Sequence, residues 1–266
     1  MFKNLFALTI ISTLFFLLSA CGKDTTDQYE SIVDRGYIIA GLDDTFAPLG
    51  FRDNDGNIVG FDIDLSKAVF EEMGLEVRYQ PIDWKMKETE LNGKNIDVIW
   101  NGYTITEERE KLVNFSDPYL SNRQVIVVMS DSNVSVKSDL AGKEVGVQAA
   151  SSSYGVLEDL DITNSFKNGE PTQFNTNDLA FRDLEYGRID AIVVDEILAR
   201  YYITLKDDSN FKVLSEDFGS EEYGVGMRQT DLELTEKFNE AFQTIKDSDT
   251  ANDISIKWFG EDIILK

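Results

Sequence analysis

The chain of 266 residues contains no histidine, a single cysteine and few basic residues. Without histidine there is no imidazole base and no ordinary zinc site, and one thiol cannot form a disulfide within the chain. The 25 lysines and arginines face 49 aspartates and glutamates, which gives a formal net charge of −24, and they form no basic cluster. Because this negative charge would repel nucleic acid phosphates, we expect no nucleic acid partner. We also expect neither a metal nor a cofactor.

A short apolar run lies near the N-terminus. It covers residues 5–18 and follows Lys3. Its fourteen residues are too few to span a bilayer comfortably, which is typical of the apolar part of a signal peptide. Cys21 directly follows Leu18-Ser19-Ala20, and this arrangement resembles the bacterial lipoprotein box. We therefore expect residues 1–20 to be removed and Cys21 to carry lipid, and the alternative is a soluble secreted protein with a chance cysteine.

After a polar tether, expected at residues 21–29, short apolar runs alternate with helical patterns. The predicted elements are a strand at 37–42, a hairpin turn at 53–57, a helix that ends at 73, a strand at 77–81, a helix at 85–91 and a strand at 96–100. Asp62 or Asp64 is expected to cap the first helix and to lie at the surface, and Gly74 follows the helix end. This alternation predicts an α/β sheet with helices on its faces.

The pattern recurs, because Gly-Lys-Asn-Ile-Asp-Val-Ile at residues 93–99 is matched by Gly-Arg-Ile-Asp-Ala-Ile-Val at residues 187–193. Two similar α/β units are therefore plausible, with chain crossings before the strand at 125–129 and near 217–222. The expected division is lobe 1 at residues 30–121 plus 223–266, and lobe 2 at residues 122–222. Ligands of open α/β sheets lie beyond the carboxyl ends of the strands, so two facing lobes predict a cleft.

Charged residues follow two of the predicted strands and suit a zwitterion. Arg109 lies in the first turn of a short helix that Thr106 could cap, and its guanidinium is suited to a carboxylate. The helix opened by residues 149–153 offers free N–H groups that also favour an anion. Asp195 supplies the opposite charge, for an ammonium. The alternatives are a solvated surface arginine and an aspartate that only caps the following helix.

Three segments resemble those of the bacterial family-3 extracellular solute-binding proteins of polar amino-acid ABC transporters. They are Gly-Phe-Asp-Ile-Asp-Leu at 60–65, Thr-Ile-Thr-Glu-Glu-Arg at 104–109 and Phe-Ser-Asp-Pro-Tyr at 115–119. The resemblance runs over essentially the whole mature chain. It implies a two-lobe periplasmic-binding-protein-like (type II) α/β fold with two hinge strands and a central ligand cleft. It also implies that the protein closes on a free amino acid and delivers it to a permease, without chemistry.

The resemblance also implies roles for individual residues. Arg109 would pair with the ligand α-carboxylate, helped by Thr104 and Ser152. Asp195 would hold the α-ammonium, and Gly102 would contribute its backbone carbonyl. Each of these roles is carried over by position in this sequence.

The remaining implied residues concern the ligand side chain. Phe46 and Trp84 would flank it, although both could be ordinary core aromatics. Asn101 takes a place where relatives often carry serine or alanine, which leaves the ligand identity open. Asp43 could contact a basic or amide side chain, or could bond backbone groups in its own loop. This mildly favours polar ligands such as glutamine, lysine, arginine or cystine.

The expected partners are the amino acid, the permease subunits and the membrane. We expect a monomer held by the lipid on Cys21 at the outer face of the cytoplasmic membrane, on the extracellular side. Two other functions stay open, a dehydratase-type enzyme on the same scaffold with Asp195 as general acid, and a ligand-sensing subunit of a signalling complex. The lack of histidine and of a second catalytic group favours a binding protein.

Overall fold

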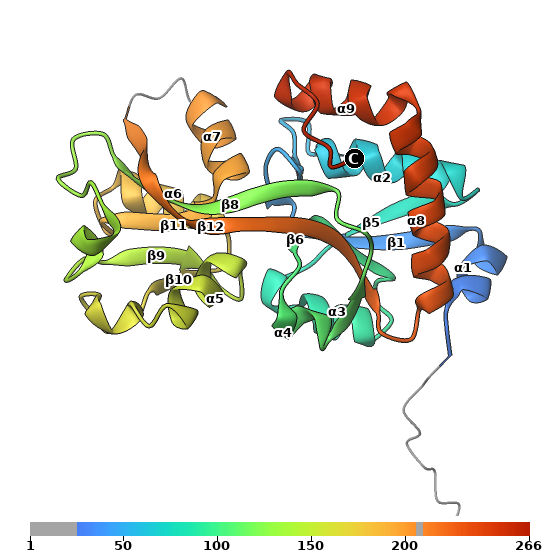
Figure 1. Cartoon of the computed structure of the whole chain (residues 1–266), viewed down its shortest axis with the longest axis horizontal. Helices are drawn as coiled ribbons and strands as arrows, with labels where there is room; N and C mark the ends of the chain where they lie inside the picture. The colour runs from blue at the N-terminus through green and yellow to red at the C-terminus, as the bar shows by residue number, and fades with distance from the viewer. Residues whose placement is uncertain (1–25, 206–209) are drawn as a thin grey trace, which may run out of the picture.

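The computed structural model describes residues 26–205 and 210–266, and it has two lobes joined by two long strands (Figure 1). These strands are β8 (Leu120–Met129) and β12 (Phe211–Arg228), which pair antiparallel and run through both lobes. The predicted signal peptide and Cys21 lie outside the described residues. Within the described part of the chain, none of the helices is both long and apolar enough to span a bilayer.

The first lobe, at the right of Figure 1, contains both ends of the described chain. Its strands are β1 (Tyr37–Leu42), β5 (Glu76–Pro81), β6 (Val98–Thr104) and β7 (Val113–Phe115), and a small separate sheet contains β2 (Thr45–Phe46), β3 (Gly50–Arg52) and β4 (Ile58–Val59). Its helices are α1 (Tyr29–Arg35), α2 (Phe61–Glu72), η1 (Trp84–Met86), α3 (Lys87–Asn92), α4 (Glu107–Glu110), α8 (Leu232–Asp247) and α9 (Asp249–Phe259). The strands and helices predicted between residues 37 and 100 all form, with small shifts at their ends.

The second lobe, at the left of Figure 1, is smaller. Its strands are β9 (Val145–Gln148), β10 (Thr172–Phe174) and β11 (Ala191–Asp195). Its helices are η2 (Lys137–Leu140), α5 (Ser152–Asp159), η3 (Thr163–Ser165), α6 (Asn177–Glu185) and α7 (Glu196–Leu205). The main sheet continues from one lobe into the other through β8 and β12.

Each lobe contains the same three-strand arrangement. In the first lobe β1 lies between β5 and β6, and in the second β9 lies between β10 and β11, with all of these pairs parallel. The segment at 93–99 leads into β6, and the similar segment at 187–193 leads into β11; these are the third strands of the two sets. The predicted recurrence of an α/β unit is therefore confirmed.

Three expectations about local structure are wrong. β6 continues to Thr104, so Asn101 and Gly102 lie within the strand rather than after it, because pairing with β12 extends as far as Thr104 and Tyr223. β8 likewise begins at Leu120, so the polar residues before the predicted strand also belong to it. Neither Asp62 nor Asp64 caps α2, whose N-cap is Gly60.

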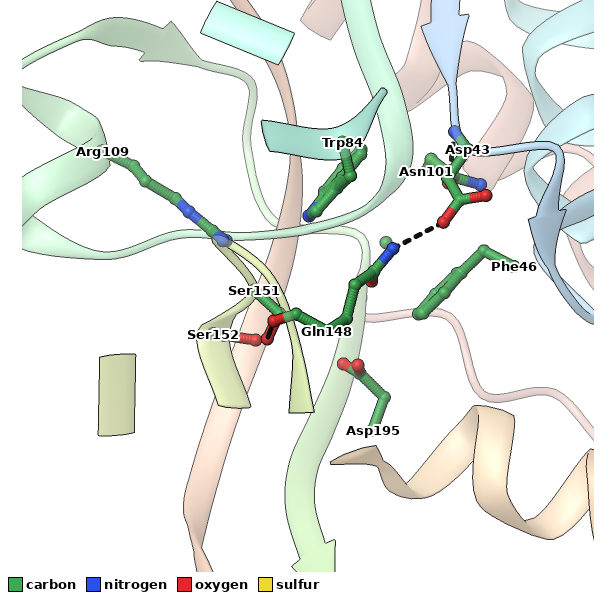
Figure 2. Close-up of a pocket in the computed structure, with 10 residues that line it drawn as sticks. Asp43, Phe46, Trp84, Asn101, Arg109, Gln148, Ser151, Ser152 and Asp195 are labelled. Atoms are coloured by element: carbon green, nitrogen blue, oxygen red, sulfur yellow. Dashed lines mark hydrogen bonds between the residues drawn. The ribbon is translucent and has the colours of Figure 1, made fainter. Parts of the chain in front are cut away.

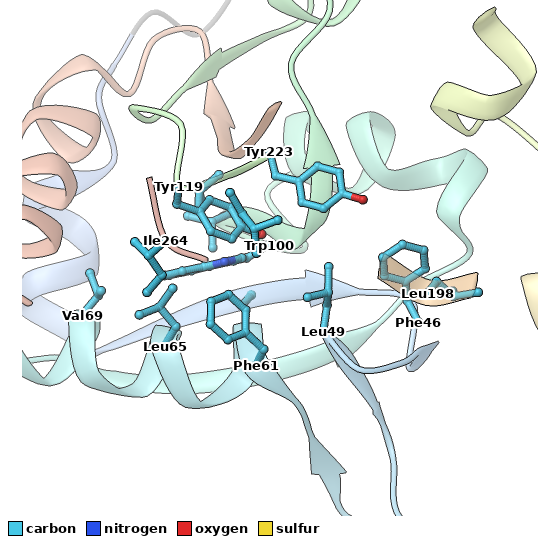
Figure 3. Packing of buried hydrophobic residues seen from close by; sticks show 14 of the residues in the cluster. Phe46, Leu49, Phe61, Leu65, Val69, Trp100, Tyr119, Leu198, Tyr223 and Ile264 are labelled. Atoms are coloured by element: carbon cyan, nitrogen blue, oxygen red, sulfur yellow. The ribbon is translucent and has the colours of Figure 1, made fainter. Parts of the chain in front are cut away.

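The core of the first lobe surrounds Trp100 on β6. Figure 3 shows Phe61, Leu65 and Val69 of α2 facing this ring. Trp100 is 2% exposed and packs edge to face against Phe238 of α8, with ring centroids 5.1 Å apart. This packing fixes the strand whose next residues, from Asn101 onward, enter the cleft between the lobes.

We expect Phe238→Ala to lower the free energy of unfolding by about 3–5 kcal/mol, because it opens a cavity against Trp100 and Phe70. Leu232→Ala on the same helix is the matched control, since Leu232 is 65% exposed and its truncation should cost less than about 0.5 kcal/mol. Urea unfolding of both variants measures the difference. Equal midpoints for the two variants would contradict this description of the core.

Candidate functional site

The structure brings eight of the nine predicted ligand-binding residues together in one pocket between the lobes (Figure 2). The ninth, Thr104, lines a wider pocket directly beside it. The space left between the side chains is about 10 Å³, roughly what one water molecule needs. The two lobes therefore lie close together around this pocket. The pocket residues are Asp43, Phe46, Trp84, Asn101, Gly102, Arg109, Gln148, Ser151, Ser152 and Asp195.

Arg109 enters the pocket from α4 and is 8% exposed. Thr106 caps this helix as predicted, with its hydroxyl oxygen 3.2 Å from the Arg109 backbone nitrogen. The guanidinium donates to the carbonyl of Thr104 at 2.9 Å and lies 4.6 Å from the centre of the Tyr103 ring. Among the described residues, no carboxylate oxygen lies within 4 Å of it. A buried cation without a carboxylate partner is suited to bind an anionic group.

Lys87, which was not predicted as a site residue, adds a second positive charge beside Arg109. Its ammonium and the Arg109 guanidinium both donate to the carbonyl of Ala150 in the other lobe, at 3.1 and 3.4 Å. Burial, and then the charge of Arg109, lowers the pKa of Lys87 to about 8, although Glu88 lies 3.3 Å away. The residues around Lys87 are mostly polar, and nothing in this stretch of the sequence indicated that the lysine would be buried.

Asp195 ends β11 and is 5% exposed. One of its oxygens accepts hydrogen bonds from Asn122 at 2.7 Å, Gln124 at 3.0 Å and the hydroxyl of Tyr223. Burial, followed by the nearby charge of Glu221, raises the pKa of Asp195 to about 7. No lysine or arginine nitrogen in the described ranges lies within 4 Å of this carboxylate. It is therefore suited to a cationic group that comes from outside the chain.

Asp43 has both of the environments considered in the sequence analysis. One oxygen accepts from the backbone of Thr45 at 3.0 Å, within its own loop. The other accepts from the amide of Gln148 at 2.6 Å, and Figure 2 shows this bond crossing the pocket from one lobe to the other. Burial raises the pKa of Asp43. Gln148 lies at the end of a strand, where residues that line the cleft were expected, but no ligand-binding role was predicted for it.

The two aromatic residues both pack and line the pocket. Phe46 is buried in the main core, and Trp84 packs edge to face on Tyr103 with centroids 5.8 Å apart. Phe46 and Trp84 are therefore both core residues and part of the pocket wall. Beside them, Asn101 accepts a hydrogen bond from the backbone of Asp43 at 3.1 Å, while its amide nitrogen is buried without a partner among the described residues. That nitrogen is available to a ligand acceptor.

Gly102 is held from below by Asp62, which is wholly buried rather than at the surface as expected. The Gly102 backbone N–H donates to Asp62 at 2.9 Å, and the hydroxyl of Tyr119 donates to the same carboxylate at 3.0 Å. Burial raises the pKa of Asp62 to about 7. Gly102 has a φ of 55°, and a Cβ there would lie 2.7 Å from Leu49. The glycine is therefore required by both conformation and space.

The floor of the site comes from the connecting strands and was not predicted. Asn122 and Gln124 are two residues apart on β8, so they face the same side, and both donate to Asp195 and to Glu221 of β12. Thr104 and Ser152, one from each lobe, lie 3.1 Å apart through their hydroxyls. The described residues contain no group of three acidic, histidine or cysteine side chains that could hold a metal ion.

Comparison with known proteins gives one consistent result. The family of bacterial extracellular solute-binding proteins, family 3, matches residues 38–261. The arginine-binding extracellular protein ArtP of Bacillus subtilis is 32% identical over 97% of this chain and 98% of its own length. The L-cystine-binding protein TcyJ of Escherichia coli is 30% identical over 87% of this chain and 86% of its own.

A solved structure is also similar over most of the chain. It is an ABC uptake transporter substrate-binding protein from Streptococcus pneumoniae with bound histidine, with a TM-score of 0.88 and 40% identity. The match covers 90% of this chain and 99% of that one. The two-lobe fold expected from the sequence is thus shared with proteins that bind amino acids.

We expect Gln148→Ala to shift the unliganded protein toward more open lobes. The lost hydrogen bond joins the lobes and ends on a buried carboxylate, and such a bond contributes about 1.5–3 kcal/mol, so the open fraction should rise roughly tenfold or more relative to the closed fraction. Small-angle X-ray scattering without ligand measures the change in radius of gyration. Gln173→Ala, at an exposed position of β10, is the control, and identical scattering from both variants would contradict the expectation.

Proposed function

This chain belongs to the bacterial extracellular solute-binding proteins, family 3, and on that basis we propose that it captures a free polar amino acid between its lobes for an ABC importer. The relatives are named as binding proteins, which favours capture over an enzymatic reaction. The permease of the importer is the expected partner.

The observation that carries this proposal is a pair of buried, opposite charges that do not neutralise each other. Arg109 belongs to the first lobe and Asp195 to the second, and no ion pair joins either of them to another described residue. A buried charge without a partner costs several kcal/mol, so a ligand that supplies both opposite charges relieves both costs. The α-carboxylate and α-ammonium of an amino acid are such a pair of charges.

The neighbouring groups divide between the two ends of the ligand. Thr104 and Ser152 line the wider pocket together with Arg109 and would assist it at the carboxylate. The carbonyl of Gly102 would accept from the ammonium together with Asp195. A ligand that lacks either end leaves one of these groups unpaired, which is how the site would discriminate against other metabolites.

The ligand side chain would extend between Phe46 and Trp84 toward Asp43 and Gln148. A carboxylate, an amide and the unpaired amide nitrogen of Asn101 favour a polar side chain there, because each can hydrogen-bond. The named ligands of the relatives, arginine, histidine and L-cystine, are all polar. We therefore place the ligand among the polar amino acids, with basic ones favoured by Asp43.

Closure would connect binding to transport. The ligand contacts both lobes only in the closed form, so it shifts the population toward that form, and the permease would recognise the closed shape. A signalling partner could read the same shape.

We expect Arg109→Ala and Asp195→Asn each to weaken amino-acid binding about 100-fold or more, since each leaves one buried ligand charge unpaired. A thermal-shift screen with the twenty amino acids and cystine identifies the ligand, and calorimetry then measures its affinity. Arg188→Ala and Asp253→Asn, at exposed positions, are the controls and should bind normally. If both site variants kept full affinity, the assignment of the two charges would be wrong.

We also propose that the lipoprotein motif operates, so that acyl chains on Cys21 hold the protein at the outer face of the cytoplasmic membrane. Two or more acyl chains anchor stably, whereas one gives marginal attachment. A tether that precedes α1 would leave the lobes free to open and close. This arrangement would keep the receptor close to its permease.

We expect Cys21→Ala to move the expressed protein from the membrane fraction to the soluble fraction, and to abolish labelling with a palmitate analogue, because no other thiol is present in the chain. Thr25→Ala, in the same tether, is the control and should stay with the membranes. Fractionation of cells followed by immunoblotting measures both. A cysteine-free variant that remained in membranes would exclude this anchor.

A further inference from the structure

Glu221 has no role in the proposed function. It lies beside Asp195 and lines the wider pocket next to the binding pocket. Asn122 donates to Asp195 at 2.7 Å and to Glu221 at 2.6 Å. Gln124 donates to the same two carboxylates at 3.0 and 2.7 Å. Because one oxygen of each carboxylate is bonded to the same nitrogen atoms, the two carboxylates lie within two hydrogen-bond lengths of each other.

Strand register produces this arrangement. Asp195 of β11 is the register partner of Gln124, and Glu221 of β12 is the register partner of Asn122. β8 lies between β11 and β12, so the two acidic side chains approach each other over its amides from both sides. The pair is therefore built by the sheet and is independent of loop conformation.

The surroundings of the pair contain neutral donors and no cation. The hydroxyl of Tyr223 donates to Asp195, and the hydroxyl of Thr104 lies 3.1 Å from Glu221. In the part of the chain that the structure describes, no lysine or arginine nitrogen is within 4 Å of either carboxylate. The pair therefore depends on neutral hydrogen bonds alone.

The nearby charged residues are engaged elsewhere. Arg123 pairs with Glu196 of α7 and with Asp217 of β12, and Arg200 also pairs with Glu196. The guanidinium of Arg109 donates a hydrogen bond to the backbone carbonyl of Thr104. None of these elements brings a compensating positive charge to the pair.

Asp195 is buried and Glu221 is half-buried. Two carboxylates this close repel each other strongly when both are ionised, and the usual solution is to hold one proton between them. Resting on the proposed function, we propose that Glu221 is the second carboxylate of the ammonium site and that it shares one proton with Asp195 until the ligand ammonium displaces that proton into solvent. The ammonium keeps its own three protons. The site changes from one negative charge with a shared proton to two negative charges around one positive charge.

The consequence is binding coupled to pH. Burial, followed by the charge of Glu221, raises the pKa of Asp195 in the free protein to about 7, and a bound ammonium favours the ionised form. Below that pH the ligand must expel a proton, so affinity falls as pH falls, by up to tenfold per pH unit. Above it the pair is already ionised and the affinity levels off. Glu221 thus acts in two ways, through Asp195 by raising the pKa of that residue, and on the ligand as the second carboxylate of the ammonium site.

The first test needs no ligand. Carbon-13 NMR of the aspartate carboxyl groups follows the titration of Asp195, whose signal is identified by its loss in Asp195→Asn. We expect Glu221→Gln to move its midpoint to lower pH, because the neighbouring negative charge is removed. Glu222→Gln, at the exposed next residue of β12, is the matched control and should leave the midpoint unchanged. An unchanged midpoint in folded Glu221→Gln would overturn the shared proton.

The second test uses L-arginine and L-glutamine as probes, because neither side chain titrates between pH 6 and 8. Calorimetry in two buffers of different ionisation enthalpy should detect release of up to about one proton at pH 6, and an affinity up to about tenfold lower at pH 6 than at pH 8. Glu221→Gln should reduce both effects, and Glu222→Gln should not. Equal proton release from the wild type and Glu221→Gln would refute the proposal. If no amino acid binds but the midpoint of Asp195 still depends on Glu221, the proposed function fails while the shared proton stands.

Discussion

The antiparallel pairing of β8 with β12 is the interaction on which the rest of the structure depends. It is the continuous connection between the lobes, with register from Leu120 and Tyr223 in the first lobe to Met129 and Phe211 in the second. The register shifts on both sides of Asp217, so the pair is irregular where it enters the second lobe. The same strands provide the floor of the pocket. A change in the angle between the lobes therefore directly moves the groups that would hold the ligand.

Charge separation within the pocket is the second organising feature. The positive wall comes from Lys87 and Arg109 of the first lobe, and the negative side comes from Asp195 and Glu221. Both groups are placed on regular elements and oriented by hydrogen bonds, so little reorganisation is needed when a dipolar ligand enters. The bonds that cross between the lobes, such as that of Asp43 with Gln148, show how the walls satisfy each other when they are closed together.

The sequence predicted the parts of the fold that follow from local pattern. Apolar runs such as that of β1 and the alternation of strand and helix are visible in the chain itself, and Thr106 with Arg109 forms a recognisable helix start. The extension of β6 could not be predicted, because its polar residues are ordered by pairing with β12 more than a hundred residues away. The burial of Asp62 depends on Gly102 and Tyr119, which lie 40 and 57 residues further along the chain. The site role of Glu221 was not predicted for the same reason, since an acidic residue in a polar stretch indicates a solvated side chain.

The repeated three-strand unit gives the pocket a direction. Asp195 ends β11 in the second lobe, and Arg109 lies on α4, which follows the counterpart strand β6 in the first lobe, so the two units contribute opposite charges to the pocket. A cavity built from two like units could in principle accept a molecule either way round. Here the reversed orientation would place like charges next to each other at both ends of the ligand. A few side chains therefore make a nearly symmetric scaffold bind its ligand in one orientation only.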